Sequence, residues 1–349
     1  FINIGGILNI KNNRSFFLGA GFSAEAGIPL TAELLTKAMK KFEDECPGIF
    51  WRVNNYAREC TQTPENEDID YSKVDFSELC TFLEFIELRE YGGGERWKDS
   101  GSKEKLNLRY YLAKTIIEAM PNTDDIPSIY MDFVNELHKG DIVITFNWDP
   151  LLEVVLNAVG KDYCYNNREP DAITLCKLHG SVNWRLGELR EYETSPIDLG
   201  WESLNFTDGM LDTEIYSSDK LIEKSVWTSH QRNSQVEPFL VLPGYGKAFD
   251  VRSNAELWYK PEFIFGFTHN VYIIGLSVAP DDFFIRSFFL SNLPHLARST
   301  EPDSRHIHII NPASDAKKNF DFVLNIGNTT LHNENFSVKH IEMMRATQT

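Results

Sequence analysis

The stretch FFLGAGFSAEAGIP, residues 16–29, decides how the chain should fold. Three apolar residues run directly into GAG at 19–21, the hydroxyl residue Ser23 follows, and GIP at 27–29 closes the stretch before a helical pattern begins. A strand that passes through a glycine turn into a helix is typical of a phosphate-binding loop. An ordinary tight connection between strand and helix is the alternative, because glycines are common at such turns. The stretch contains neither the six-residue dinucleotide fingerprint nor a Walker loop, since no Gly-Lys-Ser/Thr follows.

The size and composition of the chain indicate a large globular protein. Its 349 residues are 42% apolar and 13% aromatic, which suits one large domain with insertions or two smaller domains. The formal net charge is −17, from 34 basic and 51 acidic residues, so the surface repels nucleic acid and anionic membranes. No apolar run is long enough to span a bilayer, and the first residues lack the features of a signal peptide. We expect a cytoplasmic protein with no membrane contact and no direct binding of nucleic acid.

The cysteines are few and widely scattered. They are Cys46, Cys60, Cys80, Cys164 and Cys176. An odd number of separated thiols fits a reducing compartment. No two of them form a C-x-x-C pair, so the sequence excludes a four-cysteine zinc ribbon.

Apolar stretches of strand length alternate with helical patterns along the chain. Their continuous apolar character is typical of strands buried on both faces, as in a parallel sheet covered by helices. The alternation predicts an α/β fold built on a doubly wound, Rossmann-like parallel sheet. The expected strands are 15–20, 141–146, 172–178, 239–243, 271–277 and 306–311, and the expected helices between them are 30–45, 151–159, 254–268 and 281–295.

Two stretches interrupt this alternation. Residues 46–140 carry several amphipathic patterns separated by polar stretches, which predicts a mostly helical inserted lobe. Residues 185–237 are acidic and irregular, and we interpret them as an excursion of loops or a hairpin. Residues 14–340 then form one domain with two insertions.

Small and polar residues follow five of the expected strands. The endings read GAGFS, TFNWD, KLHGS, GLSVAPDD and INP. One such ending indicates little, because strands end in polar turns anyway. In doubly wound sheets, however, ligands bind in the crevice beyond the carboxyl ends of the strands. Five endings of this kind predict a shared ligand crevice.

Three residues in these endings are candidates for chemistry. For Asn147 the alternative interpretation is a turn asparagine after a strand. For Asp149 the alternative interpretation is a helix cap before a proline. A lone histidine such as His179 is more often half-buried and bonded to backbone. Its place before a glycine and a serine at a strand end favours a general base.

Other conspicuous side chains fit packing better than chemistry. His306 and His308 alternate on one strand face without a partner cluster in the sequence, so we interpret them as structural and not as metal ligands. Trp148 and Trp184 are neighbours of the candidate polar residues. Packing is the default for both, and stacking on a substrate is the alternative.

The motifs GAGFSAEAGIP, TFNWD and KLHGS, followed in order by GLS and INP, resemble the sirtuin (silent information regulator) family. The resemblance extends from about residue 14 to about residue 330. The first motif agrees with the family's GAG-x-S-x-x-x-GIP at every defined position, the second with its T-x-N-x-D and the third with its HG. The resemblance implies the Rossmann-like fold of that family and an NAD-binding catalytic domain over 14–340.

Two departures separate the chain from the sirtuins that deacylate proteins. Those proteins follow GIP with Asp-Phe-Arg, where this chain has LTA at 30–32, and they carry a four-cysteine zinc module that this chain lacks. The segments DFSELCTFLEF, HGSVNW and GLSVAPDDFFIRSFF are similar instead to a prokaryotic sirtuin-like branch that degrades NAD in anti-phage defence. The resemblance therefore supports an NAD site and puts the peptide cleft beside a zinc module in doubt.

The chemistry of NAD cleavage suits the candidate residues. Nicotinamide leaves as a neutral molecule from a cationic ring, so cleavage needs neither a general acid nor a metal. It needs a stabilised oxocarbenium-like ribose and a well-placed nucleophile. Asn147 is expected to bond the nicotinamide ribose or hold the attacking water, and His179 to take a proton from either. Asp149 is expected to accept a hydrogen bond from the nicotinamide carboxamide.

The other predicted site residues hold the rest of NAD. The turn that begins at Gly19 is expected to cradle the pyrophosphate with the amides of Ala20, Gly21 and Phe22 and the hydroxyl of Ser23. Gly275 and Ser277 are expected beside the phosphates and ribose, and Asn311 beside the adenosine ribose.

The sequence thus predicts an NAD glycohydrolase that uses NAD as substrate and releases nicotinamide and ADP-ribose. Three alternatives are an NAD-dependent protein deacylase, a silent NAD or ADP-ribose sensor, and a nuclease subunit of a defence complex. The missing zinc cysteines oppose the first, and the presence of Asn147 and His179 opposes the second. The acidic charge and the lack of a compact Asp/Glu cluster in the sequence oppose the third.

The resemblance also implies a biological setting, in which depletion of NAD stops an infected cell. A constitutive NADase would poison its host, so its activity must be gated. We expect a homo-oligomer with a separate regulatory partner, either a HerA-type ATPase or an argonaute-like protein.

Overall fold

The computed structural model describes residues 14–89, 103–165, 171–186, 215–217, 238–245, 270–278, 282–297, 306–324 and 328–346, together with Lys247, Trp258 and Thr268. The chain divides into two compact units. The first, here called the sheet unit, consists of Phe1–Leu30, Ala119–His179 and Glu256–Thr349. The second, here called the helical unit, consists of Thr31–Glu118 and Gly180–Ala255.

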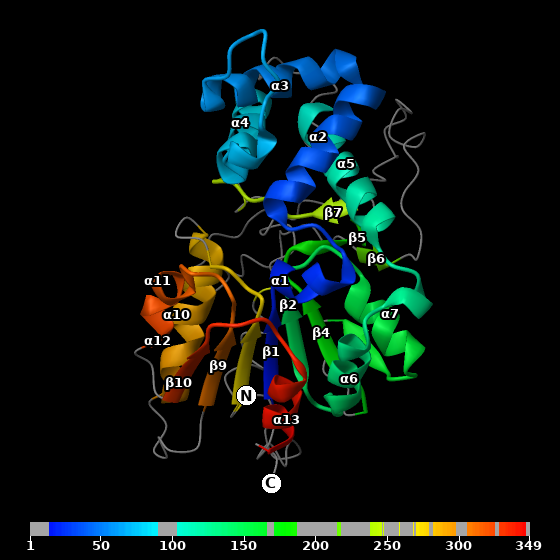
Figure 1. The fold of residues 1–349 in the computed structure, drawn as a ribbon, viewed down its shortest axis with the longest axis vertical. Helices are drawn as coiled ribbons and strands as arrows, with labels where there is room; N and C mark the ends of the chain where they lie inside the picture. Colours follow the sequence, from blue (N-terminus) through cyan, green and yellow to red (C-terminus); the bar gives the residue numbers. More distant parts are fainter. Residues whose placement is uncertain are drawn as a thin grey trace, which may run out of the picture. The chain divides into compact units, whose positions relative to one another are not determined.

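The sheet unit is built on seven parallel strands, as expected from the apolar runs (Figure 1). Their order is β10-β9-β8-β1-β2-β4-β3, and every neighbouring pair is parallel. The strands are β1 (Arg14–Leu18), β2 (Ile142–Thr145), β3 (Tyr163–Tyr165), β4 (Ile173–Lys177), β8 (Asn270–Ile274), β9 (His306–Ile310) and β10 (Asn328–His332). The strand order reverses at β1, which pairs with β2 on one side and β8 on the other.

Helices cover both faces of this sheet, which makes it doubly wound (Figure 1). On one face, Phe16 and Leu18 of β1 share a buried cluster with apolar residues of α6 (Ser128–Glu136), α7 (Leu151–Ala158) and α13 (Val338–Ala346). On the other face, the ring of Phe17 lies 4.9 Å from that of Phe289 in α10 (Phe283–Ala297). Successive strand residues point to opposite faces, so an apolar run such as Phe16–Leu18 is buried on both. The shorter helices of the unit are α1 (Ala20–Ser23), η2 (Ala24–Ala26), η4 (Thr123–Asp125), α11 (Ala316–Asn319) and α12 (Asp321–Leu324).

The helical unit packs its helices around aromatic side chains. The ring of Phe42 in α2 (Thr31–Glu45) stacks on Tyr111 of α5 (Lys103–Ala119) and meets Phe50 of α3 (Pro47–Thr61) edge-on. The unit also contains η3 (Tyr71–Lys73) and α4 (Phe76–Arg89). A separate antiparallel sheet has the order β6-β5-β7, with β5 (Gly180–Leu186), β6 (Ile215–Ser217) and β7 (Pro238–Leu240).

Three differences from the sequence prediction concern one strand and the bounds of the helical lobe. The run 239–243, expected in the parallel sheet, instead forms β7 of the antiparallel sheet. The helical unit starts at Thr31 and not near 46, because α2 packs on α3 and α5. It ends at Glu118 and not near 140, because α6 packs on the large sheet.

Two expected segments fall largely outside the described residues. Of the predicted helix 254–268, only Trp258 and Thr268 are described. Of the predicted acidic excursion 185–237, only residues 185–186 and 215–217 are described. None of the described helices is both long and apolar enough to cross a membrane.

Candidate functional site

The loops at the carboxyl end of the large sheet meet where the strand order reverses. The Gly19 amide donates to the carbonyl of Ile274 (3.0 Å), and the Gly21 amide donates to the carbonyl of Gly275 (2.9 Å). The Gly275 amide in turn donates to the carbonyl of Ile310 (2.9 Å). The ends of β1, β8 and β9 are therefore joined at the position where doubly wound sheets bind their ligands.

The glycines in these loops allow two backbones to touch. A Cβ atom on Gly19 would lie 2.3 Å from the Cα of Leu276, and one on Gly275 would lie 2.2 Å from the amide nitrogen of Phe22. Gly275 also has a left-handed φ of +60°. The protein's own packing therefore requires glycine at both positions, whatever ligand binds beside them.

We expect Gly275→Ala to lower the free energy of unfolding by roughly 2–5 kcal/mol, the sum of overpacking and left-handed strain. Thermal unfolding should show a melting temperature lower by on the order of 5–15 °C. The matched control is Gly27→Ala, because Gly27 also has a left-handed φ (+84°) but a Cβ added there would meet nothing within 4 Å. An equal loss in both variants would contradict the steric argument and leave only backbone strain.

Asn147 joins the two loops that follow β1 and β2. Its Nδ2 donates to the Gly19 carbonyl (3.0 Å) and to the Ser23 hydroxyl (3.0 Å). The Ser23 hydroxyl donates to Oδ1 of Asp149 (3.2 Å). Within the described residues, Oδ1 of Asn147 accepts no hydrogen bond, so this oxygen remains for a ligand.

Asp149 is a buried carboxyl just before α7. Its Oδ1 accepts from the amide of Leu151 (3.2 Å), the first residue of the helix, but Asp149 lies one residue before the N-cap, so the interpretation of Asp149 as the cap is wrong by one residue. Pro150 occupies the N-cap position of this helix and not its first turn. Burial raises the pKa of the Asp149 carboxyl, while the Lys177 ammonium and the Leu151 amide act in the opposite direction.

His179 follows β4 and packs among aromatic rings. Its ring lies 5.2 Å from that of Phe146, the residue before Asn147, and 5.9 Å from that of Trp258. The Leu178 amide donates to the carbonyl of Thr145 (3.1 Å), which holds the end of β4 beside the end of β2. The structure thus brings two predicted catalytic residues onto neighbouring strand ends.

Two side chains that support this site were not predicted from the sequence. Tyr130 of α6 donates its hydroxyl to the Phe22 carbonyl (2.7 Å) and accepts from the Ala26 amide (3.1 Å), which fixes the loop after β1. Lys177 is fully buried and donates to the Asp149 carbonyl (2.7 Å) and to Glu153 (2.8 Å). A lysine in the apolar strand ITLCK was the available signal, because a buried lysine needs a partner.

Two amides of the predicted phosphate-binding loop already donate hydrogen bonds within the protein. The Gly21 amide donates to Gly275, and the Phe22 amide donates to the Gly19 carbonyl (2.9 Å). Ser23 is 1% exposed and its hydroxyl lies inside the Asn147–Asp149 network. Ala20 opens α1 at the surface, and the first amides of a helix have no partner within the helix. Contact of these groups with a pyrophosphate stays a prediction.

The remaining predicted residues lie on the loops after β8 and β9. Ser277 is exposed, close to Gly275 in the loop after β8. Asn311 is buried, and its Nδ2 donates to the Leu276 carbonyl (2.8 Å) while its Oδ1 accepts from the Ala313 amide (2.9 Å). Asn311 therefore ties two strand ends together, and its contact with an adenosine ribose stays a prediction.

The cysteines do not fit a zinc module. All five are described and none forms a disulfide, and they range from exposed Cys60 to buried Cys176. Across the part of the chain that the structure describes, no cysteine belongs to a group of side chains able to hold a metal ion. The residues present therefore do not fit the four-cysteine site of the deacylating sirtuins.

Comparisons with known proteins give matches of low similarity. No family model matches the chain, and no curated protein matches it. It is similar to a crystal structure of Sir2 with the inhibitor EX-527, 2'-O-acetyl-ADP-ribose and a deacetylated p53 peptide (TM-score 0.41, 15% identity, 96% of this chain and 92% of that chain). Two others are Sir2Tm bound to a propionylated peptide (TM-score 0.36, 14% identity) and a structure described as the structural basis of sirtuin substrate affinity (TM-score 0.37, 15% identity), each with the same coverage. The α/β fold itself is established by the strand order and register of this chain, which is similar to Sir2 sirtuins at low identity.

Proposed function

We propose that the chain is an NAD glycohydrolase, which cleaves NAD into nicotinamide and ADP-ribose. The observation that carries the proposal is the fixed carboxamide of Asn147 at the reversal of the strand order. Both of its donors are held by Gly19 and Ser23, so its oxygen is directed by the framework and not by the ligand. The motif resemblance to sirtuins supports NAD as the molecule that binds there.

The reaction breaks the bond between the nicotinamide nitrogen and the ribose carbon. A water oxygen forms the new bond to that carbon, and the proton that the water loses needs an acceptor. Oδ1 of Asn147 is proposed to accept a hydrogen bond from the attacking water or a ribose hydroxyl, and His179 to take the proton. Nicotinamide leaves with the electron pair of the broken bond and becomes neutral, so the departing group needs no acid.

Binding of the rest of NAD is proposed for the loops around the glycines. The exposed Ala20 and Gly21 and the exposed Ser277 lie on the two loops that meet at the strand reversal. Backbone contacts there would take the pyrophosphate, as helix starts and glycine turns do in other doubly wound folds. Asp149 is proposed to face the carboxamide of nicotinamide, and Asn311 the adenosine ribose.

The setting is proposed from the motif resemblance alone. In this setting the chain is the NAD-depleting effector of an anti-phage system, and it forms a homo-oligomer that a separate partner controls. That partner would be a HerA-type ATPase or an argonaute-like protein.

Incubation of the purified chain with NAD is expected to release equal amounts of nicotinamide and ADP-ribose, measured by chromatography. ADP-ribose is expected to bind in a calorimetric titration even where turnover is slow. A release that occurs only with an acylated lysine peptide, with transfer of the acyl group, would identify a deacylase instead. Absence of both turnover and ADP-ribose binding would contradict an NAD site.

A further inference from the structure

Four of the nine histidines gather at one edge of the large sheet. The rings of His306 and His308 on β9 stack 6.2 Å apart, and His308 lies 5.5 Å from His332 at the end of β10. His332 lies 5.4 Å from His340 of α13. The sequence analysis interpreted His306 and His308 as structural for want of a partner cluster, and the fold supplies that cluster.

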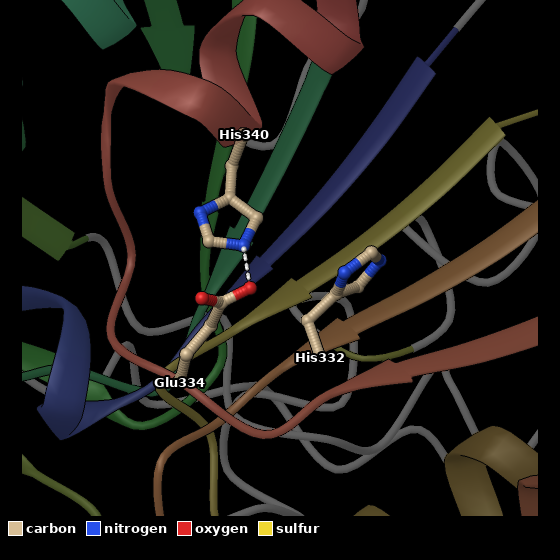
Figure 2. A group of neighbouring side chains, drawn as sticks. All are labelled: His332, Glu334 and His340. Atoms are coloured by element: carbon tan, nitrogen blue, oxygen red, sulfur yellow. Dashed lines mark ion pairs between the residues drawn. The ribbon is translucent and has the colours of Figure 1, made fainter.

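Three side chains at this edge converge on one space (Figure 2). One ligand atom each from His332, Glu334 and His340 lies within 4.8 Å of the other two. Nε2 of His340 lies 3.4 Å from Oε1 of Glu334, and the His340 side chain is 2% exposed. Nε2 of His340 is also a buried nitrogen that makes no hydrogen bond of good geometry.

This spacing matches the needs of a small tetrahedral ion. Bonds of about 2.0–2.2 Å place neighbouring ligand atoms roughly 3.3–3.6 Å apart in a tetrahedron, and the His340–Glu334 separation falls in that range. Two imidazoles with one carboxylate form a donor set of zinc sites that keep a fourth position for water. Mg²⁺ and Ca²⁺ prefer oxygen donors, so this set disfavours them.

We propose that His332, Glu334 and His340 bind a divalent transition-metal ion, with zinc as the best fit and water as the fourth ligand. The full group spans up to 4.8 Å, so the partly exposed His332 and Glu334 side chains turn inward as the ion binds. The buried His340 needs no such movement. The cleavage chemistry proposed above does not use this ion.

The two carboxylate oxygens of Glu334 have different surroundings. Oε2 pairs with the ammonium of Lys339, whereas Oε1 faces Nε2 of His340 at 3.4 Å. Oε1 is therefore the oxygen that would bind the ion.

In both imidazoles, the ring nitrogen that would not bind the ion has a hydrogen-bond partner. Nε2 of His332 lies 3.2 Å from Nδ1 of His308, so His332 binding through Nδ1 can donate its other N–H to His308. Nδ1 of His340 lies 3.0 Å from Oγ of Ser337 and 3.1 Å from the Ser337 amide. Without an ion the Ser337 amide donates to Nδ1, so the ring proton is on Nε2. With an ion on Nε2 the ring proton is on Nδ1, which then donates a hydrogen bond to the Ser337 hydroxyl in place of the bond that it accepted from the amide.

The site would connect α13 to the sheet. His332 is the last residue of β10 and Glu334 follows it by two residues, whereas His340 lies in the helix whose Ile341 and Met344 are buried in the main core cluster. The carbonyl of His332 also accepts from the Asn311 amide (3.1 Å). An ion at this position would therefore hold the loop after β9 through the backbone of its own ligand.

The test is a zinc titration of the tag-free full chain by calorimetry, with bound metal measured after dialysis. We expect one zinc ion per chain, a higher melting temperature with zinc, and a visible absorption band of tetrahedral geometry when cobalt replaces zinc. His332→Ala and Glu334→Gln should each weaken binding by at least about tenfold, since even outer partners of a metal contribute that much. His306→Ala is the matched control, because it removes a neighbouring imidazole of the same cluster without removing a ligand.

Two results would overturn the proposal. One is no zinc binding by the unaltered chain. The other is binding that both folded variants, checked by circular dichroism, retain at full strength, which would place the ion at the cysteines or elsewhere. None of these measurements depends on NAD cleavage, so they test the metal site independently of the proposed enzymatic activity.

Discussion

Asn147→Ala is expected to lower the turnover of NAD by about 100- to 1,000-fold, the usual loss for one fixed hydrogen-bonding group that acts in a transition state. The variant should also melt at a lower temperature. Nδ2 of Asn147 holds the Gly19 carbonyl and the Ser23 hydroxyl, and buried groups left without a partner cost about 1–3 kcal/mol. Loss of activity alone therefore does not separate a catalytic role from a structural one.

Ser23→Ala provides the matched comparison for this residue. It breaks the same network, since the Ser23 hydroxyl accepts from Asn147 and donates to Asp149, but it keeps the Asn147 carboxamide. We expect a similar fall in melting temperature and a loss of turnover of no more than about tenfold, because activity follows the carboxamide oxygen and not the network. Nicotinamide release and thermal unfolding measured on the same preparations decide the matter. Equal losses of turnover in the two variants would show that Asn147 has a structural role and not a catalytic one.

His179→Phe is expected to lower NAD turnover by about 100- to 10,000-fold, the usual contribution of a general base. A phenylalanine ring keeps the contacts with Phe146 and Trp258, so the melting temperature should change little. Nicotinamide release and thermal unfolding on one preparation measure both effects. A folded His179→Phe enzyme with near-normal turnover would remove His179 from the mechanism.

Imidazole rescue is the positive control for this assignment. His179→Ala leaves space between the same aromatic rings, and added imidazole should restore part of its turnover by replacing the lost base. Imidazole should not restore Asn147→Ala, which lacks a carboxamide. Rescue of both variants or of neither would not fit a base at position 179.

The central strands of the sheet were predictable because they are buried on both faces. All residues of β1, β2 and β4 are buried, and their sequences are mostly apolar, with charged residues only at the ends of β1 (Arg14) and β4 (Lys177). The edge strands β3 and β10 were missed, since YCY and NTTLH are partly exposed and mix polar with apolar residues. The run at 239–243 has the apolar character of a central strand, and nothing local in it specifies antiparallel pairing with β5.

The candidate site, like the sheet, could be predicted from the sequence only in part. The strand endings indicated residues that the fold brings to one edge, since parallel strands end side by side: Asn147 and Asp149 share a network with Ser23, and His179 packs on Phe146. The burial of the Ser23 hydroxyl between two side chains was not predictable, since it depends on the packing of two loops. The histidine cluster was missed for a related reason, because His332 and His340 belong to β10 and α13, two elements that the sequence analysis did not identify.

The position of β1 in the sheet has a consequence for synthesis on the ribosome. Residues 14–18 are made long before their partners in β8, which are residues 270–274. At 5–20 residues per second, roughly 250 further residues take about 12–50 s to translate. During this interval one side of a strand that is buried in the finished fold has no native neighbour, which exposes it to wrong pairing. The same delay keeps the glycine loops after β1 and β8 apart, so a nascent chain cannot assemble the proposed NAD site until the loop that contains Gly275 has been made.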